Sequence, residues 1–256
     1  MLPLEREFRA FAAAPEGAVE GALLVSRLVH PDTDVAWCRA RLCALAAQVG
    51  PSPSAVTLLD SLRVAGFRGA ERYDEVGNSA LELVLRTQRG IPISLAAVVI
   101  GVAEMLNLAP VGINFPGHFL VSLEGALSDP FTMTLIPPHE RDERIAGSGV
   151  PAELALRPAS PTDMVLRMLN NLRGLAGARA DHALALELAE YQLMITTDAL
   201  PVLLARADTW LALGAGLQAA RELERALALA LTDHPALSAR ITERLREIAK
   251  QRRTLH

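Results

Sequence analysis

The feature that most constrains the fold is the uncharged run "IPISLAAVVIGVA" at residues 91–103. Pro92 suits the first turn of a helix and Pro110 prevents its continuation, so we expect one apolar helix that closes near Asn107. A helix that is apolar all round is buried in a core or a membrane. Because the run is about five residues short of a membrane span and ends at Glu104, we expect a buried helix with no membrane association.

The composition favours a helical protein. Half of the residues are hydrophobic (51%), alanine and leucine dominate, and only 4% are aromatic. The formal charge of -4, without a basic stripe, argues against nucleic-acid binding. The N-terminus is charged from its fifth residue and lacks a signal-peptide core, so we expect a soluble, cytoplasmic protein. No phosphate loop, dinucleotide fingerprint or zinc spacing is present, so we expect no cofactor and no metal.

Proline and glycine clusters divide the chain into mostly helical segments. We expect Asp32 or Thr33 to cap the second helix of the N-terminal part, and Arg86 and Arg89 to be solvated charges at a helix end. A linker is expected at 146–163, which separates a first domain at 1–150 from a second at 151–256. The helices are expected at 18–29, 34–48, 54–65, 78–88, 163–175, 181–195, 201–213, 217–231 and 236–250.

Residues 111–123 and 126–135 have the branched and aromatic content of strands, with a tight turn at 124–125. With that turn, Leu123 lies opposite Ala126. His118 and Asp129 then share one sheet face as diagonal neighbours, about 7–8 Å apart. A slip of one residue in register would place them on opposite faces.

The C-terminal helices contain an internal echo at a spacing of 35 residues. The stretch "WLALGAGL", with Trp210 and Gly214, and the later Ala226 resemble the tetratricopeptide repeat, in which small residues let paired helices approach closely. A plain helical bundle is the alternative. The recurring residues are Ala185, Glu187, Leu188, Thr197 and Asp198, followed by Ala220, Glu222, Leu223, Thr232 and Asp233.

Ser94 lies where the Gly-Ile-Pro turn enters the apolar helix, and three roles are open to it. Serine is a good N-cap residue, so it can simply start the helix. It can also be a nucleophile, because a helix N-terminus offers a positive dipole end and free N–H groups that receive an oxyanion. The third role is a polar contact in a binding pocket. Likewise, His118 can be a core histidine bonded to Asp129, and Asp129 can start a turn before proline.

The stretch from about Phe67 to Phe131, with the blocks "RGIPISL" and "PGHFL", resembles the SirB1 family, as does "RMLNNLR" at 167–173. This is a bacterial group with a transglutaminase-like domain followed by tetratricopeptide-type helices. The resemblance implies an α+β fold: a papain-like core with a helical N-terminal part and a small antiparallel sheet, then an all-α domain. The family's glycine-rich continuation after "DPF" is replaced by "TMTLIPP", which bears on the pocket wall beside Asp129.

The resemblance places Ser94 at the nucleophile position, His118 at the base position and Asp129 at the orienting position. Transglutaminases have cysteine at the first of these, and members of this family typically have serine. A serine hydroxyl is far less acidic than a thiol, so it needs a base within hydrogen-bond reach.

Three functions follow as alternatives. The first is a non-enzymatic scaffold whose helical repeats bind a protein or peptide. The second is a serine-dependent acyl-transfer enzyme that uses Ser94, His118 and Asp129. The third is a peptide-binding module that uses the former substrate cleft. The sequence names neither the substrate nor the oligomeric state.

Overall fold

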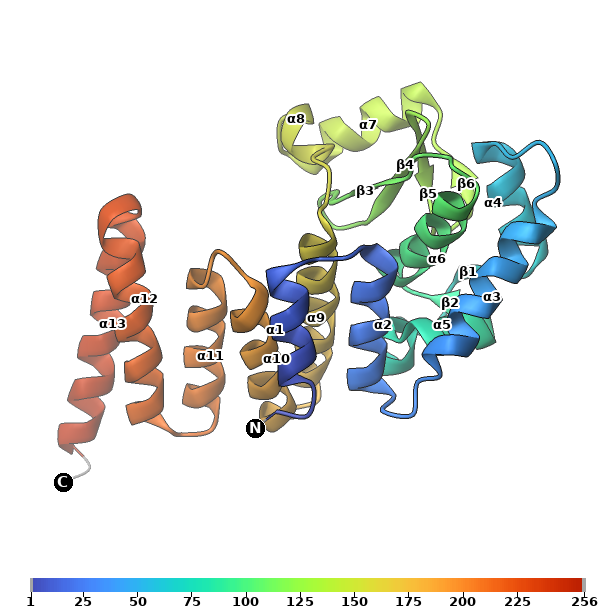
Figure 1. The fold of residues 1–256 in the computed structure, drawn as a ribbon. Helices are drawn as coiled ribbons and strands as arrows, with labels where there is room; N and C mark the ends of the chain where they lie inside the picture. The colour runs from blue at the N-terminus through green and yellow to red at the C-terminus, as the bar shows by residue number, and fades with distance from the viewer. Residues whose placement is uncertain (1, 255–256) are drawn as a thin grey trace. The chain divides into compact units, whose positions relative to one another are not determined.

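The computed structural model describes residues 2–254 and divides them into two compact units. The N-terminal unit comprises residues 6–171, and the C-terminal unit comprises residues 2–5 and 172–254 (Figure 1). The side chains of residues 232, 233 and 251–254 lie outside the description, and with them the part of the sequence echo that falls on Thr232 and Asp233. The predicted domain limits at 150 and 151 stay a prediction.

Helix α6 (Pro92–Met105) is the centre of the N-terminal unit. Every residue from Pro92 to Ala103 is buried, which explains the uncharged run. Helices α2 to α5 and strand β4 all pack against it. The elements before α6 are α1 (Glu5–Ala13), α2 (Ala18–Val29), α3 (Val35–Gln48), α4 (Ala55–Val64), β1 (Arg68–Gly69), the 3₁₀ turn η1 (Val76–Ser79), α5 (Leu81–Thr87) and β2 (Arg89–Gly90).

Local capping chemistry sets where these helices begin. Asp34, rather than the predicted Asp32 or Thr33, caps α3, and its carboxylate accepts a hydrogen bond from Trp37 N at 2.9 Å. Ser54 and Thr57 form a reciprocal capping box at the start of α4. At α6, Pro92 occupies the first helical turn, where a missing N–H has no cost.

A four-stranded antiparallel sheet in the order β3-β4-β5-β6 follows α6. Its strands are β3 (Val111–Ile113), β4 (Leu120–Leu123), β5 (Ala126–Asp129) and β6 (Thr134–Leu135). The predicted hairpin register is confirmed, because Leu123 pairs with Ala126. The turn between them has positive φ at Glu124 (51°) and Gly125 (85°), the geometry that matches strand twist in a two-residue hairpin. A separate parallel pair joins β1 to β2, with Gly69 opposite Gly90.

The predicted linker at 146–163 is wrong, because that segment is largely helical. It holds the end of α7 (Pro138–Ser148), all of α8 (Ala152–Ala155) and the start of α9 (Pro161–Ala178). Pro138 and Pro161 stand at the first positions of α7 and α9, where the missing N–H of proline has no cost. Helix α8 adds Ala155 to a small core with Ile113, Phe115, Leu120 and Ile136.

The C-terminal unit is a series of antiparallel helices in which each packs on the next along the chain. The core between them includes Leu203, Ala219, Leu223 and Ala226, and Trp210 packs against it. Gly214, at φ 70°, ends α11 in a conformation that favours glycine. After α9 the helices are α10 (His182–Ile195), α11 (Leu200–Ala212), α12 (Gly216–Asp233) and α13 (Pro235–Thr254).

Within residues 2–254, no helix is long and apolar enough to cross a membrane. The two cysteines are both free. Cys38 is buried on α3, whereas Cys43 is exposed.

Candidate active site

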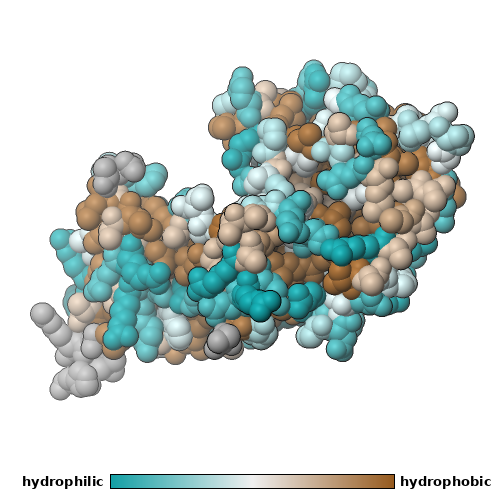
Figure 2. Space-filling view, viewed as in Figure 1, coloured by the Kyte–Doolittle hydropathy of each residue, from teal (hydrophilic) through white to brown (hydrophobic). Residues whose placement is uncertain are grey.

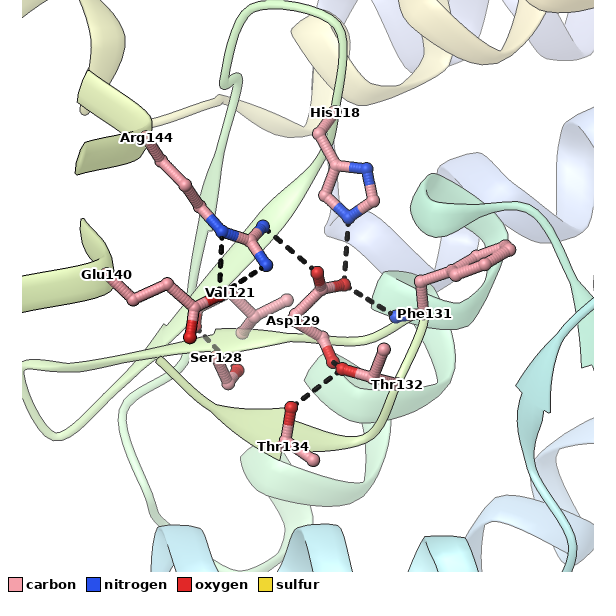
Figure 3. Close-up of polar contacts among 9 residues, drawn as sticks. All are labelled: His118, Val121, Ser128, Asp129, Phe131, Thr132, Thr134, Glu140 and Arg144. Atoms are coloured by element: carbon pink, nitrogen blue, oxygen red, sulfur yellow. Dashed lines mark hydrogen bonds and ion pairs between the residues drawn. The ribbon is translucent and has the colours of Figure 1, made fainter. Parts of the chain in front are cut away.

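His118 and Asp129 meet at the edge of the sheet. His118 lies in the turn before β4, and Asp129 is the last residue of β5. The predicted single strand at 111–123 is wrong, because the loop that contains His118 separates β3 from β4, but the side chain of His118 still reaches Asp129. His118 Nε2 donates to Asp129 Oδ1 at 2.8 Å (Figure 3). The imidazole is about one-quarter exposed (25%), whereas the carboxylate is nearly covered (5%). When such a ring is neutral, this bond keeps its proton on Nε2 and leaves Nδ1 as an acceptor.

Asp129 is held from three directions. Besides His118, its Oδ1 accepts the backbone N–H of Phe131 at 2.9 Å, and its Oδ2 accepts Arg144 Nη1 at 3.1 Å. Figure 3 shows His118 and Arg144 approaching the carboxylate from different sides, with Glu140 bonded to Arg144 behind it. Burial opposes ionisation of Asp129, but these donors, His118 first among them, outweigh it, and the pKa of the carboxyl lies below its ordinary value.

Ser94 is the third residue of α6 and not its N-cap, which is Ile91. Its side chain is fully buried. The Oγ atom accepts the N–H of Ile91 at 3.1 Å and donates to the carbonyl of Asn78 at 2.6 Å, with the Ile91 carbonyl at 3.0 Å as a second acceptor. The hydroxyl therefore ties the start of α6 to η1. As predicted, Ser94 helps to start the helix, but it does so from within the first turn and not from the N-cap position.

Two glycines shape the space around the site. An added Cβ on Gly90 would lie 2.7 Å from Ser94 Oγ, so the hydroxyl needs glycine there. An added Cβ on its strand partner Gly69 would lie 2.2 Å from the Phe131 ring. The same ring meets the His118 imidazole edge-on, with centroids 6.3 Å apart. Phe131 therefore fills the space between the imidazole and the glycine pair.

Of the three predicted site residues, the structure brings two into contact. Among the described residues, no hydrogen bond joins Ser94 to His118, and Nδ1 of His118 has no protein partner. The histidine is thus oriented as a base would be, whereas the hydroxyl is committed to backbone. Within the same residues, no cluster of three or more His, Cys, Asp or Glu is placed to hold a metal ion.

Comparison with known proteins gives the family. Residues 36–170, more than half of the chain, match the transglutaminase-like superfamily. The chain belongs to this superfamily. The UPF0162 protein of Pseudomonas aeruginosa is 32% identical over 253 residues and covers 93% of each chain. A UPF0162 protein of Vibrio cholerae is 28% identical over 50% of this chain and 53% of its own, and one of Xylella fastidiosa is 32% identical over 59% and 62%. No solved structure matches.

The transglutaminase-like unit also contains site residues that sequence reasoning missed. Arg144 was not considered because it lies in a charged segment, "PHERDER", that reads as a solvated helix. Only the packing of α7 beside the sheet shows that it reaches Asp129. The motif "DPF" did contain Phe131, but nothing in the sequence shows that its ring lies on Gly69.

The expectation that Arg86 and Arg89 are merely solvated is wrong. Arg86 pairs with the buried Glu82 at 2.6 Å and stacks 3.9 Å over the Trp37 ring. Arg89 belongs to β2 and donates to the carbonyl of Gly66 at 2.7 Å. Both arginines hold the helices around α6 together rather than face a ligand. Asn78 bonds to backbone, through its Nδ2 to the carbonyl of Arg72.

Proposed function

We propose that this transglutaminase-like protein is a non-catalytic protein-interaction or regulatory scaffold. The observation that carries the proposal is the buried Ser94 hydroxyl, which donates to the carbonyl of Asn78. A serine becomes a nucleophile only when a base removes its proton during attack, and the base must lie within hydrogen-bond reach. A hydroxyl whose one proton is donated to a backbone carbonyl stabilises the fold and does not act as a nucleophile.

The finer family assignment belongs to the same proposal. We assign the chain to the SirB1 group, with α10 to α13 as tetratricopeptide-type repeats that bind a protein or peptide in the cytoplasm. Exposed leucines at the end of α11 and on α12 support such a surface: Leu211, Leu213, Leu217, Leu229 and Leu231. Figure 2 shows apolar colour on the part of the surface that α12 and α13 form. Exposed apolar residues gathered on one unit are typical of interaction surfaces.

The first test asks whether Ser94 reacts. The protein and its Ser94→Ala and His118→Ala variants are treated with a fluorophosphonate that phosphonylates nucleophilic serines, and labelling is measured by mass spectrometry. We expect no labelling of Ser94 in the native protein. Labelling that disappears in Ser94→Ala and in His118→Ala would overturn the non-catalytic proposal.

The second test replaces the hydroxyl by a thiol. Ser94→Cys is made in a Cys43→Ser background, because Cys43 is exposed and would react with any thiol reagent. We expect slow alkylation, since a buried thiol resists ionisation. Burial, the largest cause, raises the pKa of Cys38 to about 11, so Cys38 is a matched internal standard for a covered thiol. An introduced thiol that alkylates faster than a free cysteine, with a depressed pKa, would contradict the proposal.

A serine-dependent acyl-transfer enzyme is the second candidate, and one observation favours it. The His118–Asp129 pair is complete at 2.8 Å, and the Nδ1 of the ring is available. Catalysis would require Ser94 to leave the Asn78 carbonyl and approach Nδ1. The two tests above distinguish this candidate, because it predicts both the labelling and the reactive thiol.

A further inference from the structure

A polar pocket of about 370 Å³ lies beside α9 in the N-terminal unit, and neither candidate function uses it. It includes the motif "RMLNNLR", whose Arg167, Asn170 and Asn171 are three and four residues apart and so share one helix face. Two of the pocket's amide side chains come from this helix and one from the loop after β3. The lining residues are Asn114, Asp163, Leu166, Arg167, Asn170 and Asn171.

Arg167 has unused donors in this pocket. Its Nη1 donates to the Asn114 amide oxygen and to the carbonyl of Phe115, the latter at 3.2 Å. Among the described residues no carboxylate pairs with Arg167, and its Nε and Nη2 have no hydrogen-bond acceptor. Burial lowers the pKa of Arg167, but a guanidinium stays charged in proteins. A half-buried cation without a counter-ion is energetically costly, and an anionic ligand would remove that cost.

We propose that this pocket binds a carboxylate, which is held by the Nε and Nη2 edge of Arg167. The planar fork of a guanidinium matches the two oxygens of a carboxylate. Asn171 is an amide donor on the next turn of the same helix face. A pocket of about 370 Å³ is larger than a carboxylate alone, so it also accommodates the chain that bears it. We assign the ligand as an acidic side chain of a peptide.

A dianion such as phosphate fits less well. Asp163 lines the same pocket, so the wall charge is one cation and one anion. Its carboxylate accepts hydrogen bonds from Ser160 N and Oγ at 2.9 Å each and from Arg157 at 3.4 Å. Asp163 therefore leaves Arg167 free but repels a second negative charge on the ligand.

The pocket is connected to His118 through one carbonyl. Phe115 O accepts both the backbone N–H of His118 at 3.1 Å and Nη1 of Arg167 at 3.2 Å. A ligand that bonds to the guanidinium therefore changes the surroundings of the loop that carries the imidazole. This gives a spectroscopic readout that does not depend on Ser94, so the proposal stands or fails separately from the question of catalysis.

The test is a titration followed by nuclear magnetic resonance on the full chain. The probes are N-acetyl-glutamate methylamide, its glutamine counterpart, acetate and inorganic phosphate. We expect the glutamate probe to shift the His118 ring signals, and we expect it to bind at least about tenfold more tightly than glutamine, because a charged hydrogen-bonded pair is lost in the latter. Comparable binding of acetate would make the ligand a small carboxylate. Equal binding of glutamine, or tighter binding of phosphate, would overturn the proposal.

Variants separate the pocket from general effects. Arg167→Ala is expected to lower affinity for the glutamate probe at least about tenfold, and Arg167→Lys less, because lysine keeps the charge but loses the fork. Asn171→Asp places a negative charge in the pocket without touching the His118 loop, so it tests carboxylate binding even if Arg167→Ala fails to fold. Arg141→Ala, an exposed arginine on α7 paired with Asp142, is the matched control. Unchanged affinity in Asn171→Asp would contradict the proposal.

Discussion

The two halves of the candidate site differ in what their side chains are free to do. Beside the sheet, His118 is partly exposed and oriented by Asp129, and its Nδ1 has no partner among the described residues. On α6, Ser94 is fully buried and bonded to two backbone groups. The base half of the site, His118 with Asp129, is thus oriented as a general base requires. The nucleophile half, Ser94 on α6, is instead bonded in a way that stabilises the fold.

The two halves are therefore stabilised by different interactions. The base half depends on charge, because Asp129 receives donors from His118, Arg144 and the backbone. The nucleophile half depends on close packing of uncharged groups, with Gly90 leaving room for the hydroxyl. Four predictions, given in order of decreasing size, test whether the halves are as separate as this contrast implies.

Removing the Asp129 carboxylate should have the largest effect. Asp129→Ala leaves the Arg144 guanidinium and the His118 ring without their acceptor, and we expect the unfolding free energy to fall by about 2.5 kcal/mol, less than for a fully buried pair because both partners keep some solvent. Denaturant unfolding measures this. Asp129→Asn, which keeps an acceptor, should lose less. No change in the alanine variant would mean that the charged network does not stabilise the base half.

Gly69→Ala should act through the Phe131 ring. The new methyl would lie 2.2 Å from the ring, so the ring must move, at a cost of about 2 kcal/mol. Adding Phe131→Leu should recover much of the loss, which a double-mutant cycle measures. Chemical shifts of the His118 ring should change in Gly69→Ala. If the two substitutions are additive, the ring does not occupy the space that the contact indicates.

Ser94→Ala should destabilise the protein by about 1.5 kcal/mol, because the buried Ile91 N–H and Asn78 carbonyl each lose a partner. Ser128→Ala is the matched control, since Ser128 is equally buried but donates only to the Val121 carbonyl, at 2.7 Å. We expect thermal and denaturant unfolding to rank Ser94→Ala as the more costly. A neutral Ser94→Ala variant would show that the hydroxyl is not needed for folding, which would favour the enzymatic candidate.

The pH dependence of stability should be the mildest effect. The pKa of Asp129 is lower in the folded protein than in the unfolded chain, so its contribution is fully present above the unfolded pKa of about 3.9 and is lost as pH falls through the folded value. Unfolding free energy should therefore decrease more steeply with acidification in the native protein than in Asp129→Asn. Parallel curves for the two proteins would contradict the assigned pKa.

Much of the fold was predictable because it follows from local patterns. The apolar run predicted α6, and the Glu124–Gly125 turn predicted the hairpin register that brings His118 close to Asp129. The failures have two causes. The segment at 146–163 was assigned to a linker because proline and glycine are ambiguous, since they both end helices and begin them. Arg144, Phe131 and Arg167 were missed because their partners are distant in sequence.

The buried helix and the two-residue hairpin turn follow from the sequence alone, since they depend on periodicity and on neighbours along the chain, whereas the contact between His118 and Asp129 followed only if the hairpin register held. Only the tertiary structure decided what the Ser94 hydroxyl bonds to. Its acceptor at Asn78 lies 16 residues away, on η1, and no local pattern indicates that this carbonyl is nearer than the imidazole. A hydroxyl has one proton, so whichever acceptor the packing brings closest determines its role.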